Sequence, residues 1–361
     1  MGKMFTPWQI NNLTIKNRIM RSGTVECLAD AQGRPGQAIS DIFNTLAQNN
    51  VGLIVGGMAY VNKRGQAVPR QTGIYDDSLL DSLSRLTEGV HQNGGLVAAQ
   101  LVHAGGISYP ALLGGINPVG PSAGVNPVTN AKVDELTHSQ IENIIVDFGQ
   151  AARRAQKAGY DAVQLYMAHC LLIGQFISPF FNRRNDEYGD RQLFPLNVFR
   201  EVRRMVGPGY PVFAKVNAVD NLDGGLEFAD ALELMCKLDE LGIDAIEISG
   251  GMGGGNMPYS PSLKVDDKND DGYFYSYALQ AKKALSCPVI SVGGWRTYNK
   301  VEQALDKVDV IALSRPLLAQ PNLVSLWEQG REFISGCTSC NKCFDFAFRS
   351  GLACVLHQKK N

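Results

Sequence analysis

Short hydrophobic runs alternate with longer segments of helical periodicity along most of the chain. The runs, rich in Val, Ile and Leu, predict eight buried strands, at 18–22, 52–58, 96–101, 162–166, 212–216, 245–248, 289–292 and 310–313. The segments between them predict helices at 77–92, 139–158, 192–206, 228–241, 275–285 and 299–306. Strands that alternate with helices in this way indicate a parallel sheet that is covered on both faces.

Eight strand–helix units favour a (β/α)8 TIM barrel over a doubly wound sheet. The doubly wound alternative also lacks its dinucleotide-binding fingerprint. The glycine-rich stretch 250–256 has no G-x-G-x-x-G spacing and lies near the sixth predicted strand instead of the first. We therefore expect one α/β barrel over residues 1–330, followed by a short cysteine-containing extension over 331–361.

Composition and charge exclude several classes of protein. Hydrophobic residues make up 45% and charged residues 19% of the 361 residues, which is ordinary for a globular enzyme. The 34 Lys and Arg nearly balance the 35 Asp and Glu, so nothing favours nucleic acid or an anionic membrane as a partner. The N-terminus lacks a signal-peptide pattern and no apolar run could span a bilayer, so we expect a cytoplasmic protein. The sequence leaves open whether the chain forms a homo-oligomer.

Polar residues and glycines lie at the C-terminal ends of the predicted strands, where TIM barrels carry their chemistry. They are Ser22, Gly23, Thr24, Gly57, Gln100, Tyr166, His169, Lys215, Gly293, Gly294, Ser314 and Arg315. The last four follow the seventh and eighth strands, the usual place of a phosphate site in this fold. The alternative is that the glycines only turn the chain and that Arg315 pairs with an acid.

Lys215 interrupts the hydrophobic run 212–216. A lysine that points into a barrel is costly unless it meets a negative partner, so it indicates a ligand-binding or catalytic role. Alternatively, its side chain could extend to solvent at the strand end. Gln100 could likewise be a satisfied core amide, or it could bind the edge of a heteroaromatic ring.

Several motifs together resemble the old yellow enzyme family of FMN-dependent ene-reductases and NADH:flavin oxidoreductases. They are NRI at 17–19, QLVHAG at 100–105, GQFISP at 174–179, N-x-R-x-DEYG at 182–189, VGG at 292–294 and ALSRP at 312–316. The barrel portion is similar to 2,4-dienoyl-CoA reductase and trimethylamine dehydrogenase. The resemblance covers nearly the whole chain.

The resemblance implies noncovalent FMN at the barrel mouth, with hydride passing from NAD(P)H to flavin N5 and then to an acceptor such as an α,β-unsaturated carbonyl. FMN would contact Ser22, Gly23, Thr24, Gly57, Gln100, Lys215, Gly293, Gly294, Ser314 and Arg315. Lys215 would lie beside N1 and the C2 carbonyl, Gln100 at the pyrimidine edge, and Gly293, Gly294, Ser314 and Arg315 at the phosphate. Tyr166 and His169 match the pair that binds the acceptor's carbonyl oxygen.

The sequence departs from the family pattern at three positions. The family usually has His where this chain has Tyr166. Its usual proton-donating Tyr corresponds to Leu171, so the proton would have to come from water or another group. Val25 stands where the family usually presents Thr, Cys or His to the flavin C4 carbonyl, which would alter the flavin's potential.

Four cysteines crowd the end of the chain: Cys337, Cys340, Cys343 and Cys354. Their short spacings are compatible with a 4Fe–4S cluster, a structural zinc ion or unoccupied thiols. The multidomain relatives carry a 4Fe–4S cluster on similar spacing and a further nucleotide-binding domain. This sequence contains no such domain, so we expect the electron partner of any cluster to be a separate redox protein or to be missing altogether.

Two other functions remain compatible with the residues. One is a phosphate-binding aldolase or isomerase barrel in which Lys215 forms a Schiff base. The other is a flavin-binding electron-relay protein that has lost its acceptor chemistry, which Leu171 would permit. The leading hypothesis is an NAD(P)H-dependent FMN oxidoreductase that acts on a small-molecule acceptor.

Overall fold

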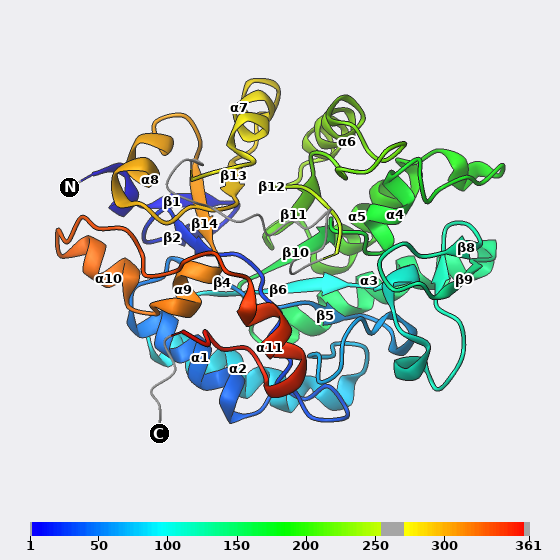
Figure 1. Cartoon of the computed structure of the whole chain (residues 1–361), viewed down its shortest axis with the longest axis horizontal. Helices are drawn as coiled ribbons and strands as arrows, with labels where there is room; N and C mark the ends of the chain where they lie inside the picture. Colours follow the sequence, from blue (N-terminus) through cyan, green and yellow to red (C-terminus); the bar gives the residue numbers. More distant parts are fainter. Residues whose placement is uncertain (1, 254–270, 357–361) are drawn as a thin grey trace.

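The computed structural model describes residues 2–253 and 271–356, and its centre is a closed parallel barrel (Figure 1). The barrel strands are β3 (Ile19–Arg21), β4 (Leu53–Val55), β6 (Val97–Val102), β10 (Ala162–Met167), β11 (Val212–Asn217), β12 (Ile246–Ser249), β13 (Val289–Val292) and β14 (Val310–Leu313). They pair in this order, and β10 also pairs with β6, which closes the ring. The predicted (β/α)8 fold is confirmed.

Helices connect successive strands and cover the outside of the barrel (Figure 1). They are α1 (Gln37–Gln48), α2 (Leu80–Gln92), α3 (His138–Lys157), α5 (Leu193–Val206), α6 (Phe228–Glu240), α7 (Tyr275–Ala284), α8 (Tyr298–Ala304), α9 (Arg315–Ala319) and α10 (Leu323–Glu328). The six predicted helices correspond to α2, α3 and α5–α8, whereas α1, α9 and α10 were not predicted.

The longest of these helices, α3, shows why the periodicity was informative. Thr137 and Gln140 form a reciprocal capping box that satisfies backbone groups at its start. Ile141, Phe148 and Ala152 then fall on one buried face. That face belongs to the core between the helices and the barrel.

A hairpin closes the N-terminal end of the barrel. Its strands, β1 (Trp8–Ile10) and β2 (Leu13–Ile15), are antiparallel. Trp8, Ile10 and Ile15 belong to the same buried cluster as the inner-barrel residues Met20 and Phe213. Since this end is filled, a ligand has to enter from the opposite, C-terminal end.

Further short strands and helices lie outside the eight strand–helix units. They are β5 (Ala59–Tyr60), β7 (Val119–Gly120), β8 (Gly124–Val125), β9 (Lys132–Glu135), α4 (Leu172–Ile177) and α11 (Lys342–Ser350). Short 3-10 helices lie at Lys3–Phe5, Lys63–Gly65, Asp77–Leu79, Gly105–Ile107, Pro110–Leu113 and Glu187–Gly189.

The cysteine-containing extension folds back onto the barrel, and Figure 1 shows its helix α11 in red beside the barrel opening. Arg70 Nη2 donates to the carbonyl oxygens of Ala347 and Phe348, both at 3.3 Å. The Leu352 N–H donates to the Glu26 carbonyl at 2.8 Å. The extension therefore forms part of the C-terminal end of the barrel. None of the helices described is both long and apolar enough to cross a membrane.

Candidate functional site

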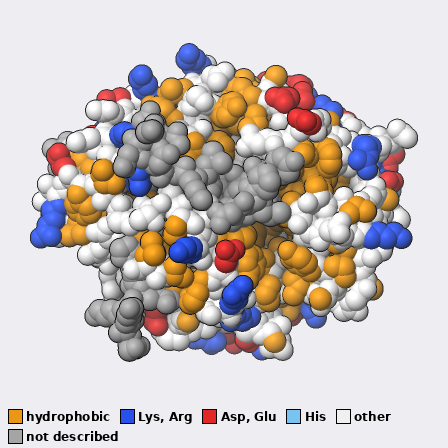
Figure 2. Space-filling view, viewed as in Figure 1, with side chains coloured by type: hydrophobic (Ala, Val, Ile, Leu, Met, Phe, Trp, Pro, Cys, Tyr) orange, Lys and Arg blue, Asp and Glu red, His pale blue; other side chains and the backbone are white. Residues whose placement is uncertain are grey.

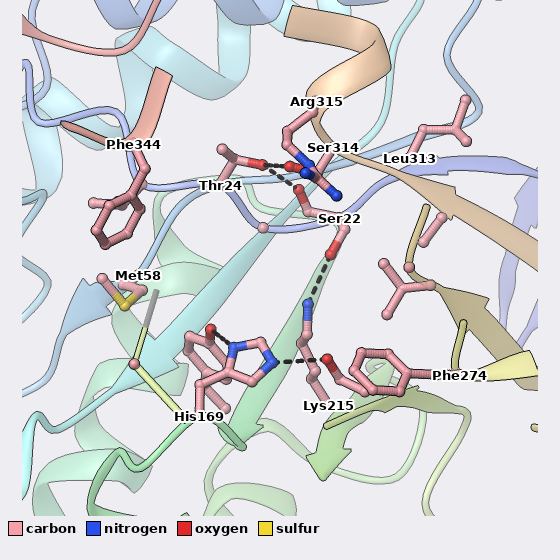
Figure 3. Close-up of a pocket in the computed structure, with 18 of the residues that line it drawn as sticks. Ser22, Thr24, Met58, His169, Lys215, Phe274, Leu313, Ser314, Arg315 and Phe344 are labelled. Carbon is pink, nitrogen blue, oxygen red and sulfur yellow. Dashed lines mark hydrogen bonds between the residues drawn. The ribbon is translucent and has the colours of Figure 1, made fainter. Parts of the chain in front are cut away.

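A cavity of about 280 Å³ opens at the C-terminal ends of the barrel strands. Ten of the predicted site residues line it together: Ser22, Gly23, Thr24, Tyr166, His169, Lys215, Gly293, Gly294, Ser314 and Arg315. Figure 3 shows Ser22, Thr24, His169, Lys215, Ser314 and Arg315 around the cavity. Gln100 and Gly57 are buried and are not among its lining residues. The glycine-rich stretch predicted at 250–256 lies outside the described residues beyond Gly253.

Lys215 points into the barrel and is only 4% exposed, so the alternative in which it extends to solvent is wrong. Its Nζ donates to Ser22 Oγ at 2.9 Å and lies 3.0 Å from Glu247 Oε1. Ser22 Oγ in turn donates to the same carboxylate oxygen at 2.6 Å. Glu247 supplies the negative partner that a buried ammonium requires.

Glu247 was not predicted as a site residue, although it interrupts a hydrophobic run just as Lys215 does. Glu247 is a charged residue inside the hydrophobic run of β12, and it is fully buried. It also lies opposite Lys215 in the pairing of β11 with β12. Two charged residues on neighbouring barrel strands therefore form one ion pair.

Two buried amides extend this network. Gln164 Nε2 donates to Glu247 Oε2 at 2.7 Å, and Gln100 Nε2 donates to Gln164 Oε1 at 2.7 Å. Gln100 Oε1 is buried and has no hydrogen-bond partner. A Cβ added at Gly23 would lie 2.5 Å from Gln100 Nε2, so a glycine is required beside this amide. The network thus ends in an unsatisfied acceptor, which is costly in a protein interior.

The opposite side of the cavity is built from glycines and hydroxyl groups. Gly293 has a φ of +113°, and a Cβ there would lie 2.6 Å from Tyr273 Cε2. Thr24 Oγ1 and Ser314 Oγ are 2.8 Å apart. These groups come from the ends of β3, β13 and β14, and the predicted phosphate residues are those that follow β13 and β14.

Arg315 lies at this side of the cavity and contacts the extension. Its Nη1 donates to Asn341 Oδ1 at 2.5 Å and its Nη2 to the Tyr273 hydroxyl at 3.3 Å. Both partners accept from the guanidinium. The extension therefore helps to position the cation predicted to bind phosphate.

Tyr166 and His169 are in direct contact. The Tyr166 hydroxyl lies 2.6 Å from His169 Nδ1, and His169 Nε2 lies 2.7 Å from Ser249 Oγ. Burial, and then the charge of Lys215, holds the pKa of His169 well below its usual range. Burial, and then the charge of Glu247, raises the pKa of Tyr166. The pair is therefore a neutral imidazole beside a protonated phenol.

The remaining wall of the cavity is largely apolar. Leu171 and Val25, the two departures from the family pattern, both line it, together with Met58, Ile107, Val128, Phe344 and Phe348. Phe344 and Phe348 come from α11, which the sequence analysis did not predict. Figure 2 shows hydrophobic side chains exposed on the face that carries α11.

Cys170, next to Leu171, is an inert buried thiol. It is 2% exposed and Asn126 Nδ2 donates to its sulfur at 3.8 Å. Burial raises the pKa of Cys170 to about 12. Such a thiol keeps its proton at neutral pH, so it does not replace the missing tyrosine as an acid.

The cavity fits the FMN that the resemblance implies. Lys215 lines the cavity, and the unsatisfied Gln100 Oε1 is buried behind Gly23, which also lines it, so the two groups together suit an imide N–H next to a carbonyl. The opposite end of the cavity offers glycines, hydroxyl groups and a guanidinium, a set suited to a phosphate.

The four cysteines of the extension do not form a recognisable metal site. Burial raises the pKa of the Cys337 and Cys343 thiols, and their neighbouring cysteines act in the same direction. Nevertheless, within the part of the chain that the structure describes, no three His, Cys, Asp or Glu side chains are placed to hold a metal ion. We therefore derive no chemistry through a metal here.

Sequence comparison then decides the family. A model of the NADH:flavin oxidoreductase / NADH oxidase family matches residues 3–333. The chain belongs to this family. The predicted family resemblance is thus confirmed, and the chain belongs to a family of oxidoreductases associated with FMN and NAD(P)H.

Individual relatives agree with this family assignment. An NADH oxidase from Thermoanaerobacter brockii is 32% identical over 346 residues, which are 94% of this chain and 52% of that protein. An NADPH dehydrogenase from Bacillus velezensis is 32% identical over 331 residues, covering 89% of this chain and 92% of that protein. The solved complex of 2-naphthoyl-CoA reductase with 2-naphthoyl-CoA is 25% identical, with a TM-score of 0.90 over 96% of this chain and 55% of that one. This member of the family therefore spans about half the length of some relatives and nearly all of another.

Proposed function

We propose that this family member binds FMN in the barrel cavity and uses NAD(P)H to reduce a small electron-poor acceptor, such as an α,β-unsaturated carbonyl compound. Bound FMN would supply the electron transfer between the two substrates. The observation that carries the proposal is the buried network beneath the cavity, in which Lys215, a lining residue, is linked through Glu247 and Gln164 to Gln100, whose Oε1 is unsatisfied.

The binding residues divide into two groups by their chemistry. Lys215 and Gln100 would bind the pyrimidine edge of the flavin, since they offer a donor and an acceptor at the buried floor. Gly293, Gly294, Ser314 and Arg315 would hold its phosphate, while Ser22, Gly23, Thr24 and Gly57 would complete the wall near β3 and β4.

Tyr166 and His169 would orient and polarise the acceptor. A neutral imidazole carries one N–H, so His169 accepts a hydrogen bond from one of its hydroxyl neighbours and donates to the other. The Tyr166 phenol stays protonated, because its pKa is raised. It can therefore donate to a carbonyl oxygen that enters the cavity. Leu171 donates no proton, so the acceptor's proton would come from water.

The test is a visible spectrum followed by turnover. Protein reconstituted with FMN should show flavin absorption after removal of free FMN and should oxidise NAD(P)H in the presence of a simple enone. Lys215→Ala should weaken FMN binding, because it removes the only charged group that β11 contributes to the cavity among the described residues. Protein that retains no flavin would refute the proposal.

The two alternative functions are distinguished by the same site. An aldolase needs a free amine at Lys215, yet Nζ is held by a hydrogen bond to Ser22 and an ion pair with the fully buried Glu247 carboxylate. Family membership also disfavours this alternative. An electron-relay protein without acceptor chemistry would bind FMN but would not couple NAD(P)H oxidation to the enone.

The metal assignment of Cys337, Cys340, Cys343 and Cys354 stays a prediction. Iron with acid-labile sulfide, in protein purified without oxygen, would indicate a cluster. One equivalent of zinc would indicate a structural ion, and neither metal would indicate free thiols. A cytoplasmic location and a separate redox partner also stay predictions.

A further inference from the structure

Glu247 is fully buried and belongs to no residue set that the sequence analysis assigned to the site. It accepts hydrogen bonds from Ser22 and Gln164 and forms the ion pair with Lys215. These contacts occupy both carboxylate oxygens: Oε1 faces Ser22 and Lys215, while Oε2 faces Gln164. Such a complete set of partners is what a buried carboxylate needs to stay ionised.

We propose that Glu247 is a positioning residue that sets the reduction potential of the flavin through Lys215 and orients Gln100 toward it through Gln164. This inference rests on the proposed binding of FMN.

The first expected effect of Glu247 is on the charge beside the flavin. Reduction of a bound flavin places negative charge on the ring edge that Lys215 would contact, and a fixed cation there favours reduction. In this chain the Glu247 carboxylate lies 3.0 Å from the Lys215 Nζ. Figure 3 shows the hydrogen bond from Lys215 to Ser22, which also contacts this carboxylate. The carboxylate offsets part of the ammonium charge in a buried site, where screening is weak. Glu247 should therefore lower the potential that Lys215 alone would give.

The second effect of Glu247 is on the direction of the hydrogen bonds made by Gln164 and Gln100. An ionised carboxylate only accepts hydrogen bonds, so Gln164 must turn its NH₂ group toward Glu247. Gln164 then presents its oxygen to Gln100, whose NH₂ group donates to it at 2.7 Å. The Gln100 oxygen is left as the acceptor without a partner. Glu247 thus fixes, through two amides, which atom of Gln100 is available to a ligand N–H.

The pairing of strands holds these residues in place. Lys215 lies opposite Glu247 between β11 and β12, and Gln100 lies opposite Gln164 between β6 and β10. All four side chains come from central positions of barrel strands. Their positions therefore do not depend on loop conformation, which suits a role in tuning a cofactor.

The experiment measures the FMN reduction potential of the reconstituted full-length protein at pH 6. Glu247→Gln keeps the size and polarity of the side chain but removes its charge. We expect reduction of the bound flavin to become about tenfold more favourable, which is a positive shift of about 30 mV for a two-electron couple. Glu247→Asp keeps the charge but draws it back from Lys215, so we expect a smaller positive shift.

The control is Glu240→Gln, which makes the same charge change at an exposed position at the end of α6 and should leave the potential unchanged. Circular dichroism and thermal unfolding show whether each variant folds, and Glu247→Asp serves as the test if Glu247→Gln does not. An unchanged or lower potential in a flavin-bound Glu247 variant would overturn the inference while leaving the proposed function intact. If the wild-type protein retains no FMN after reconstitution, the proposed function itself is overturned.

Discussion

The hydroxyl groups of Tyr166 and Ser249 contact the two ring nitrogens of His169, one hydroxyl group at each nitrogen. Figure 3 shows His169 pointing across the cavity floor near Lys215, whose positive charge disfavours protonation of the ring. The imidazole therefore stays neutral and relays hydrogen-bond direction between Tyr166 and Ser249. An acceptor bound here meets a phenol whose orientation is already fixed.

Tyr166→Phe should slow reduction of an enone by about 100-fold, since it removes one prearranged donor from the developing oxyanion. The flavin spectrum should not change, because Tyr166 is not expected to contact the cofactor's phosphate or pyrimidine ends. The rate of the acceptor half-reaction, measured by stopped flow, checks this. Tyr160→Phe is the matched control, because Tyr160 is also buried but does not line the cavity. Equal rates in the Tyr166 variant and wild type would show that Tyr166 does not polarise the acceptor.

A second buried histidine should make stability depend on pH. His103 is 1% exposed and its Nδ1 accepts from the Gly105 N–H at 3.0 Å. Burial, and then the charge of Arg64, lowers the pKa of His103 to about 3. The folded state therefore holds this imidazole neutral, while the unfolded chain protonates it near its usual pKa of about 6.5.

Because the unfolded state binds the extra proton, this contribution to stability is complete above pH 6.5 and is lost as pH falls toward 3. The loss should approach about 1.4 kcal/mol per pH unit within that window. His103→Asn should show a shallower loss of stability with acid in denaturant titrations at pH 7, 6 and 5. His138→Asn, at a histidine that is more than half exposed, should keep the wild-type slope. Parallel slopes in the His103 variant and wild type would contradict the assignment.

At the same scale, sequence reasoning identified the residues with unusual positions but not their partners. Lys215 stood out because it interrupts a hydrophobic run, and Glu247 does the same in β12. Their pairing depends on which strands are neighbours and in what register, and neither property can be read from one run alone. Gln164 was missed for the same reason, since an amide in a strand becomes informative only beside Glu247.

At the scale of elements, the barrel strands were predictable because they are buried on both faces. Burial on both faces gives continuous hydrophobic runs, and β13 and β14 agree with prediction at both ends. Helix α1 was missed although its buried residues Ile39, Phe43, Leu46 and Ala47 follow helical spacing, because its N-cap is Gly36, which provides no capping side chain to mark its start. Helix α11 was missed because tertiary contacts through Arg70 and Leu352 hold a short segment in place.

The end of α11 gives an element-scale prediction. Gly351 ends this helix with a φ of +93° and a ψ of 163°, a conformation that is nearly restricted to glycine. A Cβ there would also lie 2.1 Å from Leu28 Cδ2. Gly351→Ala should therefore detach the end of α11 and lower the thermal midpoint. Hydrogen exchange of the α11 amides should then be faster than in wild type.

Gly330→Ala is the matched control for this change. Gly330 also has a positive φ, +79°, but a Cβ there would meet nothing within 4 Å. It should lower stability by about 1–2 kcal/mol through backbone strain alone, without faster exchange in α11. Equal effects of the two substitutions would show that the Leu28 contact does not hold the extension in place.

At the scale of the whole molecule, segments from early and late in the chain lie together around the cavity. The first barrel strand supplies Ser22 and Thr24, and the last supplies Ser314. The extension then contributes Asn341 to Arg315 and two phenylalanines to the apolar wall. The extension therefore completes one wall of the cavity, so its docking and ligand binding should be coupled.

Glu26 is the residue on which this junction depends most. Its Oε1 accepts from Arg21 Nη2 at 2.9 Å and from the Gly57 N–H at 3.1 Å, and its carbonyl accepts from Leu352 at the end of the extension. The side chains of Arg21 and Glu26 are only 4% and 3% exposed. Removing one charge of a buried pair leaves the other without compensation, which typically costs about 3–5 kcal/mol. Glu26→Gln should therefore lower the free energy of unfolding by that order and weaken FMN retention as well.

The comparison for Glu26→Gln is Glu233→Gln, which breaks the exposed Glu233–Lys237 pair within α6. An exposed pair of this kind contributes little, so its loss should change neither stability nor FMN retention measurably. Thermal unfolding of both variants, with and without excess FMN, checks the coupling. If FMN raises the midpoint of Glu26→Gln as much as that of wild type, the first strand, the second strand and the extension do not act as one unit around the cavity. If it raises that midpoint less, the buried Arg21–Glu26 pair links the closure of the barrel to the binding of its ligand.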